Sequence, residues 1–195
     1  MLIGALIDVP SRLGYLALAL FVGMEASGVP VPGETALITS SVLASQGKLA
    51  IELVIPIAAA AAIIGDNIGY ALGARYGRRV LERPGRTQQR RLEMLRRGDD
   101  LFTRHGPKAV FFGRWVAGLR IWAAWLAGMT TMPWRSFLLW NALGGIVWAI
   151  WFGLLGYFGG EAAAKVVEKV GIGAAVAVGL ALLVAYVVYR RRRPH

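Results

Sequence analysis

The 195-residue sequence contains no cysteine and only two histidines. The absence of cysteine excludes disulfide bonds, thiolate metal ligands and cysteine nucleophiles. Charged residues are also scarce, at 17% of the chain against about 25% in soluble domains, whereas hydrophobic residues make up 56%. This balance predicts a polytopic membrane protein that forms a single domain.

Acidic residues are half as frequent as basic ones, 11 against 22, which leaves a net charge of +11. Such a charge can indicate nucleic-acid binding, but no aromatic-basic RNA motif or recognition helix is evident. Basic residues beside apolar spans are instead typical of cytoplasmic loops, so we predict no nucleic-acid partner. The N-terminus lacks a basic n-region and a small-residue cleavage site, which argues against a removed signal peptide.

Long uncharged apolar runs are few. A spanning helix needs about 20 apolar residues, and two stretches, 136–159 and 171–189, meet this length without a charge. A third, 53–76, is long enough but contains Asp66 and Asn67. Its glycines recur every fourth residue, at 65, 69, 73 and 77, which predicts a small-residue face for close helix packing.

Other apolar stretches are too short to cross. Residues 13–24 and 35–47 number 12 and 13, roughly 20 Å each as helix, and a turn separates them. The stretch 107–134 repeats this pattern, broken around Arg114 and Arg120. We expect four residues to make the turns: Pro30, Pro32 and Gly33 in the first hairpin and Gly118 in the second. Both hairpins are predicted to be re-entrant, a form tolerated where protein or water covers the broken backbone.

The basic residues predict the topology. Eleven Lys and Arg lie from Arg75 to Lys108 and four more at 190–193, and both groups should be cytoplasmic. A hairpin followed by a spanning helix then occurs twice in opposite orientations, which is an inverted-topology repeat. Two spanning pairs in place of the hairpins would give the same parity, so length is what favours re-entry.

The predicted fold is therefore an all-α integral membrane protein built as an inverted repeat, with one extra spanning helix. Its parts are repeat 1 at 10–77, a basic cytoplasmic loop at 78–106, repeat 2 at 107–160 and a C-terminal transmembrane helix at 171–189. Within the loop, residues 87–104 form an amphipathic helix on the inner leaflet in one interpretation and a solvated basic loop in the other.

Charges within the membrane segments indicate the site. A charge at the bilayer centre costs at least about 2.5 to 3.5 kcal/mol and is usually paired. Glu25 and Glu34 in one hairpin would compensate Arg114 and Arg120 in the other if the tips meet. Two guanidiniums could hold a phosphate by bidentate hydrogen bonds, and a phosphate competing for them would change the protonation of the acids. Asp66 is either a further proton or cation site or a structural partner of a turn. The alternative for the two glutamates and the two arginines is a static ion-pair lattice that holds the hairpins together.

Several motifs resemble one known family. They are EASGVPVPGE at 25–34, GDNIGYALGARYG at 65–77, FTRHG at 102–106, FGRWVAGLR at 112–120 and AGMTTMPWRSF at 127–137. In this order and spacing, over residues 10–160, they resemble the DedA family, also called the SNARE-associated Golgi or VTT-domain family. The resemblance implies two opposed re-entrant hairpins and transport of polyprenyl phosphate, the lipid carrier recycled across the bacterial inner membrane.

The family's essential acids and arginines fall here on Glu25, Glu34, Arg114 and Arg120. The sequence departs from the family pattern at Ala117, where proline is usual in R-x-x-P-x-x-R, so the second turn must rely on Gly118. The resemblance also implies a multi-pass protein of the bacterial cytoplasmic membrane, and residues 78–108 and the C-terminus are expected in the cytoplasm. More distant relatives in eukaryotes are phospholipid scramblases.

Our first hypothesis is a flippase for a lipid phosphate such as undecaprenyl phosphate, coupled to H⁺ or Na⁺. Alternatives are a proton-coupled transporter of a small ion or cationic drug, and a general phospholipid scramblase. An enzyme acting on a lipid phosphate would need a nucleophile with a base or a metal cluster, and His105 and His195 are scattered. We therefore predict no catalytic residue, metal or organic cofactor. The expected partners are the lipid substrate and membrane lipids, and a homo-oligomer is also possible. Asn141 is expected to make a structural interhelical hydrogen bond.

Overall fold

The computed structural model describes residues 9–77, 106–115, 119–130 and 132–160, together with positions 89, 93, 96, 100, 102, 104 and 162. Every regular element within these ranges is helical. The predicted C-terminal helix at 171–189, most of the amphipathic segment 87–104, and the turn residues Ala117 and Gly118 lie outside the described residues. The all-helical class predicted from the sequence is confirmed for the described part of the chain.

The first hairpin consists of α1 (Val9–Ala26) and α2 (Gly33–Ser45). Helix α1 ends where Gly28 adopts a φ of +104°, a left-handed conformation that favours glycine, and its N–H bonds back to the Glu25 carbonyl at 3.0 Å. Pro30 and Pro32 follow and cannot continue a helix, because they lack the N–H that an interior residue donates. The predicted turn is therefore present, and Gly33 is the first residue of α2.

Two helices of the described chain are long and apolar enough to cross a membrane. One is Ile51–Gly77, in which α3 (Ile51–Leu72) continues into a short π-helical segment, η1 (Gly73–Gly77); the other is Trp134–Gly160. Each contains 27 residues, about 40 Å of helix, which exceeds a hydrocarbon core of about 30 Å. These two helices match the predicted spans at 53–76 and 136–159.

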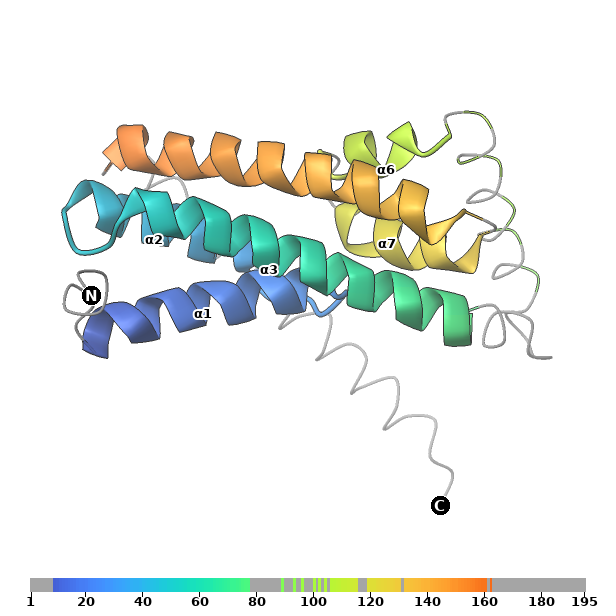
Figure 1. The fold of residues 1–195 in the computed structure, drawn as a ribbon, viewed down its shortest axis with the longest axis horizontal. Helices are drawn as coiled ribbons and strands as arrows, with labels where there is room; N and C mark the ends of the chain where they lie inside the picture. Colours follow the sequence, from blue (N-terminus) through green and yellow to red (C-terminus); the bar gives the residue numbers. More distant parts are fainter. Residues whose placement is uncertain are drawn as a thin grey trace, which may run out of the picture.

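The second hairpin consists of α6 (Lys108–Gly113) and α7 (Leu119–Met129), both much shorter than a span. In Figure 1, α1 and α2 lie along the half of α3 that begins at Ile51, whereas α6 and α7 lie near the half that ends at Leu72. The end of α1 and the start of α7 therefore lie close to each other near the middle of the long helices (Figure 1). The re-entrant character of the hairpins and the repeat relationship stay predictions.

The glycine stripe of α3 and η1 is the surface on which both hairpins pack. A Cβ at position 65 would collide with the Gly23 carbonyl oxygen of α1 and lie 2.8 Å from the Ala26 Cβ. Farther along, Gly69 and Gly73 adjoin Trp125 of α7. The remaining glycine of the stripe, at position 77, adjoins Met129 of α7. The close packing predicted from the four-residue spacing is thus confirmed, because at positions 65 and 73 only a hydrogen in place of a side chain leaves room for the facing backbone.

Two buried apolar clusters hold the hairpins against the long helices. The cluster around the first hairpin includes Leu18, Val22, Leu37, Val54, Ala58 and Trp148. The cluster around the second includes Val110, Ala124, Ala127, Met132 and Phe137. In addition, the Trp125 Nε1–H of α7 donates to the Ser27 carbonyl oxygen at 2.8 Å. The first turn and the second hairpin are therefore joined by a direct hydrogen bond.

Candidate functional site

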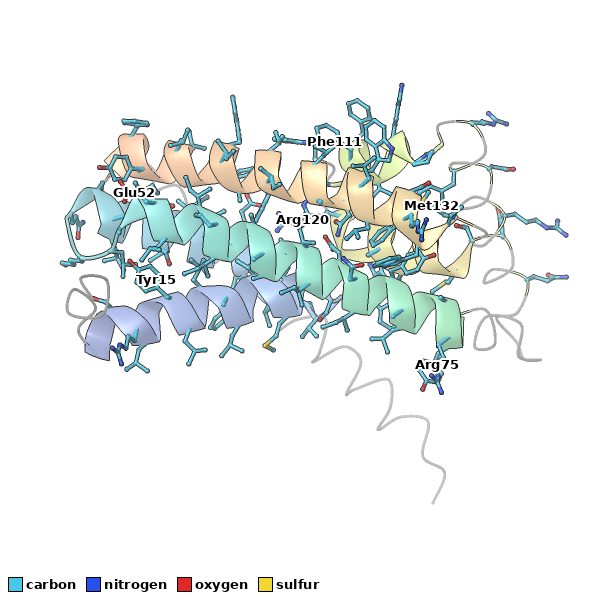
Figure 2. All side chains as sticks on the ribbon, in the orientation of Figure 1. Tyr15, Glu52, Arg75, Phe111, Arg120 and Met132 are labelled. Carbon is cyan, nitrogen blue, oxygen red and sulfur yellow. The ribbon has the colours of Figure 1, made fainter. Side chains whose placement is uncertain are left out.

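Arg120 joins the two hairpins at the centre of the molecule (Figure 2). From the first turn of α7, its Nη2 donates to Glu25 Oε1, near the end of α1, and its Nη1 donates to Glu34 Oε2, at the start of α2. One guanidinium therefore pairs with carboxylates from both arms of the first hairpin. The side chains of Arg120 and Glu25 are 18% and 13% exposed, and that of Glu34 is 36% exposed.

The turn of the first hairpin holds the side chain of Glu25 against the backbone of Glu34. The Glu34 backbone N–H donates to Glu25 Oε2 at 3.1 Å, so both oxygens of Glu25 accept a hydrogen bond. Gly33 makes this approach possible, because a Cβ at that position would lie 2.6 Å from Glu25 Oε2. The Pro/Gly turn thus brings residues nine positions apart onto one guanidinium.

Arg114 has a different set of partners. It follows α6 directly, and its Nη1 donates to Asp66 Oδ2 of α3 and, at 2.9 Å, to Asn141 Oδ1 of the Trp134–Gly160 helix. Asn141 is fully buried, and its Nδ2 donates to the Ile63 carbonyl oxygen at 3.4 Å. The side chains of Arg114 and Asp66 are 11% and 5% exposed. This pair is therefore deeper than the Arg120 cluster and is held by both long helices.

Trp148 connects the two ion-pair groups. The guanidinium carbons of Arg114 and Arg120 each lie 5.7 Å from the centre of its ring, within the range of cation–π attraction. Trp148 is 3% exposed and stands seven residues, about two helical turns, after Asn141, so the two share one face of their helix. A single helix face thus supports both arginines.

A small cavity lies between these groups. Its volume is about 20 Å³, and Glu25, Asp66, Arg114, Arg120 and Trp148 form its polar and aromatic lining. This volume accommodates about one water molecule. A phosphate group is larger than this cavity.

The charges of the site do not balance. Three carboxylates, those of Glu25, Glu34 and Asp66, face the two guanidiniums of Arg114 and Arg120. With all five groups ionised the site carries one net negative charge. The unbalanced carboxylate is one of the two acids that share Arg120. Within the described residues, no group of three or more His, Asp or Glu side chains is arranged to hold a metal ion.

The structure brings together the four charged residues expected from the sequence but pairs them differently. The expectation that both arginines face Glu25 and Glu34 is met by Arg120, whereas Arg114 pairs with Asp66. Asp66, for which two roles were open, lies inside the site. Asn141 makes the expected interhelical hydrogen bond and also binds Arg114.

Trp148 is the site residue that the sequence did not indicate. Seven tryptophans are spread through the second half of the chain, and an apolar helix does not by its composition show which face turns inward. The spacing of seven residues from Asn141 is the signal that could have found it, because a polar residue in an apolar helix usually marks the face that packs on protein.

The long apolar helices and the charges buried between them define the class: a helical membrane protein with an ionic site in its interior. The chain belongs to the VTT-domain family, since residues 31–158 match that domain. The motif resemblance to the DedA family is confirmed by the relatives, two of which are the Escherichia coli (strain K12) proteins Protein DedA and Inner membrane protein YohD.

The similarity to these relatives extends over most of the chain. Uncharacterized membrane protein Rv2637 of Mycobacterium tuberculosis is 38% identical over 192 residues, which cover 95% of this chain and 87% of that protein. YohD is 33% identical, with 77% of this chain and 73% of YohD covered. Protein DedA is 30% identical, with 67% of this chain and 60% of DedA covered. No solved structure matches the chain significantly.

Proposed function

We propose that this protein is a lipid-phosphate transporter that carries a polyprenyl phosphate such as undecaprenyl phosphate across the bacterial inner membrane. The observation that carries the proposal is Arg120 of one hairpin, held between Glu25 and Glu34 of the other. A phosphate can replace the carboxylates as the partner of a guanidinium, because it offers the same bidentate acceptor geometry and a charge at least as large.

In the proposed cycle the head group passes between the hairpin turns while the isoprenoid chain stays in the lipid. The phosphate displaces Glu34 and Glu25 from Arg120, and Arg114 supplies a second guanidinium on the other side of the cavity. The displaced carboxylates then lack their cationic partner in a nonpolar environment, so they bind H⁺ or Na⁺. Release of the phosphate on the other side lets Arg120 return to the acids, and the coupling cation leaves.

The decisive experiment is transport of a labelled polyprenyl phosphate in proteoliposomes that contain Arg120→Ala or Arg114→Ala. Loss of a charge-assisted hydrogen bond of about 1.5 to 3 kcal/mol should lower transport about 10- to 150-fold. Arg135→Ala is the matched control, because Arg135 is exposed at the start of the Trp134–Gly160 helix. Folded Arg120→Ala and Arg114→Ala variants that transport at the rate of Arg135→Ala would refute the proposal.

A second candidate is proton-coupled exchange of a small ion or a cationic drug. It is favoured by the excess of carboxylates, which gives the site a net negative charge when all groups are ionised. This function requires that Glu25→Gln abolish cation transport and that a polyprenyl phosphate not compete. A general phospholipid scramblase, in contrast, would move labelled phosphatidylcholine as fast as the polyprenyl phosphate in the same vesicles.

A further inference from the structure

Within the part of the chain that the structure describes, the indole Nε1 of Trp148 is a buried polar atom without a hydrogen-bond partner. Its side chain is 3% exposed, and its indole Nε1–H has no hydrogen-bond acceptor among the described residues. Buried donors are nearly always satisfied in folded proteins, and an exception calls for an explanation. The Trp148 side chain lines the cavity together with Glu25, Asp66, Arg114 and Arg120, so its indole is part of the wall of the ionic site.

The indole ring is also fixed with respect to both arginines. Each guanidinium carbon lies 5.7 Å from the ring centre, and the ring packs against Phe152 with the two centres 5.8 Å apart. Because Trp148 belongs to a long helix and the arginines belong to the second hairpin, the ring face serves as a common support for the two cations. A group that binds to the arginines therefore comes close to the indole.

We propose that Trp148 is a third binding residue for the anionic head group. The inference rests on the proposed function: when a phosphate binds to the arginines, the indole N–H donates to one phosphate oxygen. Indole and guanidinium N–H groups are donors without acceptor capacity, so together they select an oxyanion and not a cation. The neutral donor adds a directional bond without adding positive charge to the site.

The test compares Trp148→Phe, which keeps an aromatic face for the arginines but removes the N–H, with Trp148→Leu, which removes both. Trp151→Phe is the matched control, because Trp151 is on the same helix and 60% exposed. The probe is farnesyl phosphate as a competitor of polyprenyl phosphate transport, with farnesol as the phosphate-free reference. We expect Trp148→Phe to raise both the inhibition constant of farnesyl phosphate and the KM for polyprenyl phosphate about 10-fold, as for a lost hydrogen bond to a charged group. Trp151→Phe should match the parent protein.

A second readout does not depend on activity. In protein labelled with ¹⁵N at its tryptophan side chains, the indole resonance that is lost in Trp148→Phe should shift with farnesyl phosphate and stay unchanged with farnesol. If Trp148→Phe does not fold, the spectrum of the parent protein decides: the absence of any indole shift specific to farnesyl phosphate would overturn the inference.

The outcomes separate this inference from the function on which it rests. Unchanged competition in Trp148→Phe, together with lost competition in Arg120→Ala, overturns the role of Trp148 and leaves the lipid-phosphate transporter intact. Competition that persists in a folded Arg120→Ala variant overturns both. A loss in Trp148→Leu with none in Trp148→Phe shows that only the ring face acts, through the arginines, and it also overturns the direct bond.

Discussion

Removal of the Arg120 charge should destabilise the protein through the two acids that it leaves behind. In Arg120→Gln, the carboxylates of Glu25 and Glu34 face each other without a cation, and Glu25 is 13% exposed. Breaking a buried ion pair from one side costs about 3 to 5 kcal/mol. Because the Glu34 side chain is 36% exposed and partly screened by solvent, we expect the lower end, about 3 kcal/mol. For a chain of this length that corresponds to a fall of about 6 to 12 °C in the melting temperature.

The assay is thermal unfolding of the purified protein in detergent, followed by intrinsic fluorescence. Arg120→Gln combined with Glu25→Gln and Glu34→Gln should recover at least half of the lost stability, because the triple variant buries neutral amides in place of unpaired charges. It should nevertheless remain inactive in transport. Arg135→Gln, at an exposed position, should stay within about 0.5 kcal/mol of the parent protein. A triple variant no more stable than Arg120→Gln would refute the reasoning, since the destabilisation would then not come from the uncompensated acids.

Two further predictions concern how the hairpins pack. Gly65→Ala places a methyl group against the Gly23 carbonyl oxygen and should destabilise the folded protein by about 1 to 3 kcal/mol. Gly14→Ala is the control, because its Cβ would lie 3.5 Å from Leu49. It should leave the stability unchanged or raise it by up to about 1 kcal/mol. Equal melting temperatures for the two alanine variants would contradict the close approach of α1 to α3. Trp125→Phe removes the hydrogen bond to the Ser27 carbonyl oxygen and should lower the stability by about 1 kcal/mol. The melting temperature should then fall by about 2 to 4 °C. An unchanged melting temperature would mean that this bond does not hold the turn.

Much of the fold could be predicted because it depends on local properties of the chain. The two long helices follow from the length of their apolar runs, and the first turn follows from Pro30 and Pro32. The glycine stripe is equally local, since a spacing of four places small residues on one side of any α-helix. The start of α1 at Val9 was not predicted, because the predicted apolar stretch began at residue 13, after Arg12.

The site could be predicted in its residues but not in its pairing. Charges within apolar sequence stand out, so Glu25, Glu34, Arg114 and Arg120 were found from the sequence. Which acid meets which arginine depends on how the hairpins pack on α3, and the sequence does not give that packing. The sequence therefore could not assign Asp66 to Arg114.

What the sequence determined is thus the set of helices, the breaks between them and the charges that need compensation, because each follows from neighbours along the chain. What only the tertiary structure decided is the arrangement of those charges: Arg120 shared by two acids, Arg114 held by Asp66 and Asn141, and Trp148 beneath both arginines. The physical reason is that ion pairs and cation–π contacts act over a few ångströms between residues up to 95 positions apart. Only the packing of both hairpins against the two long helices brings such groups within that range.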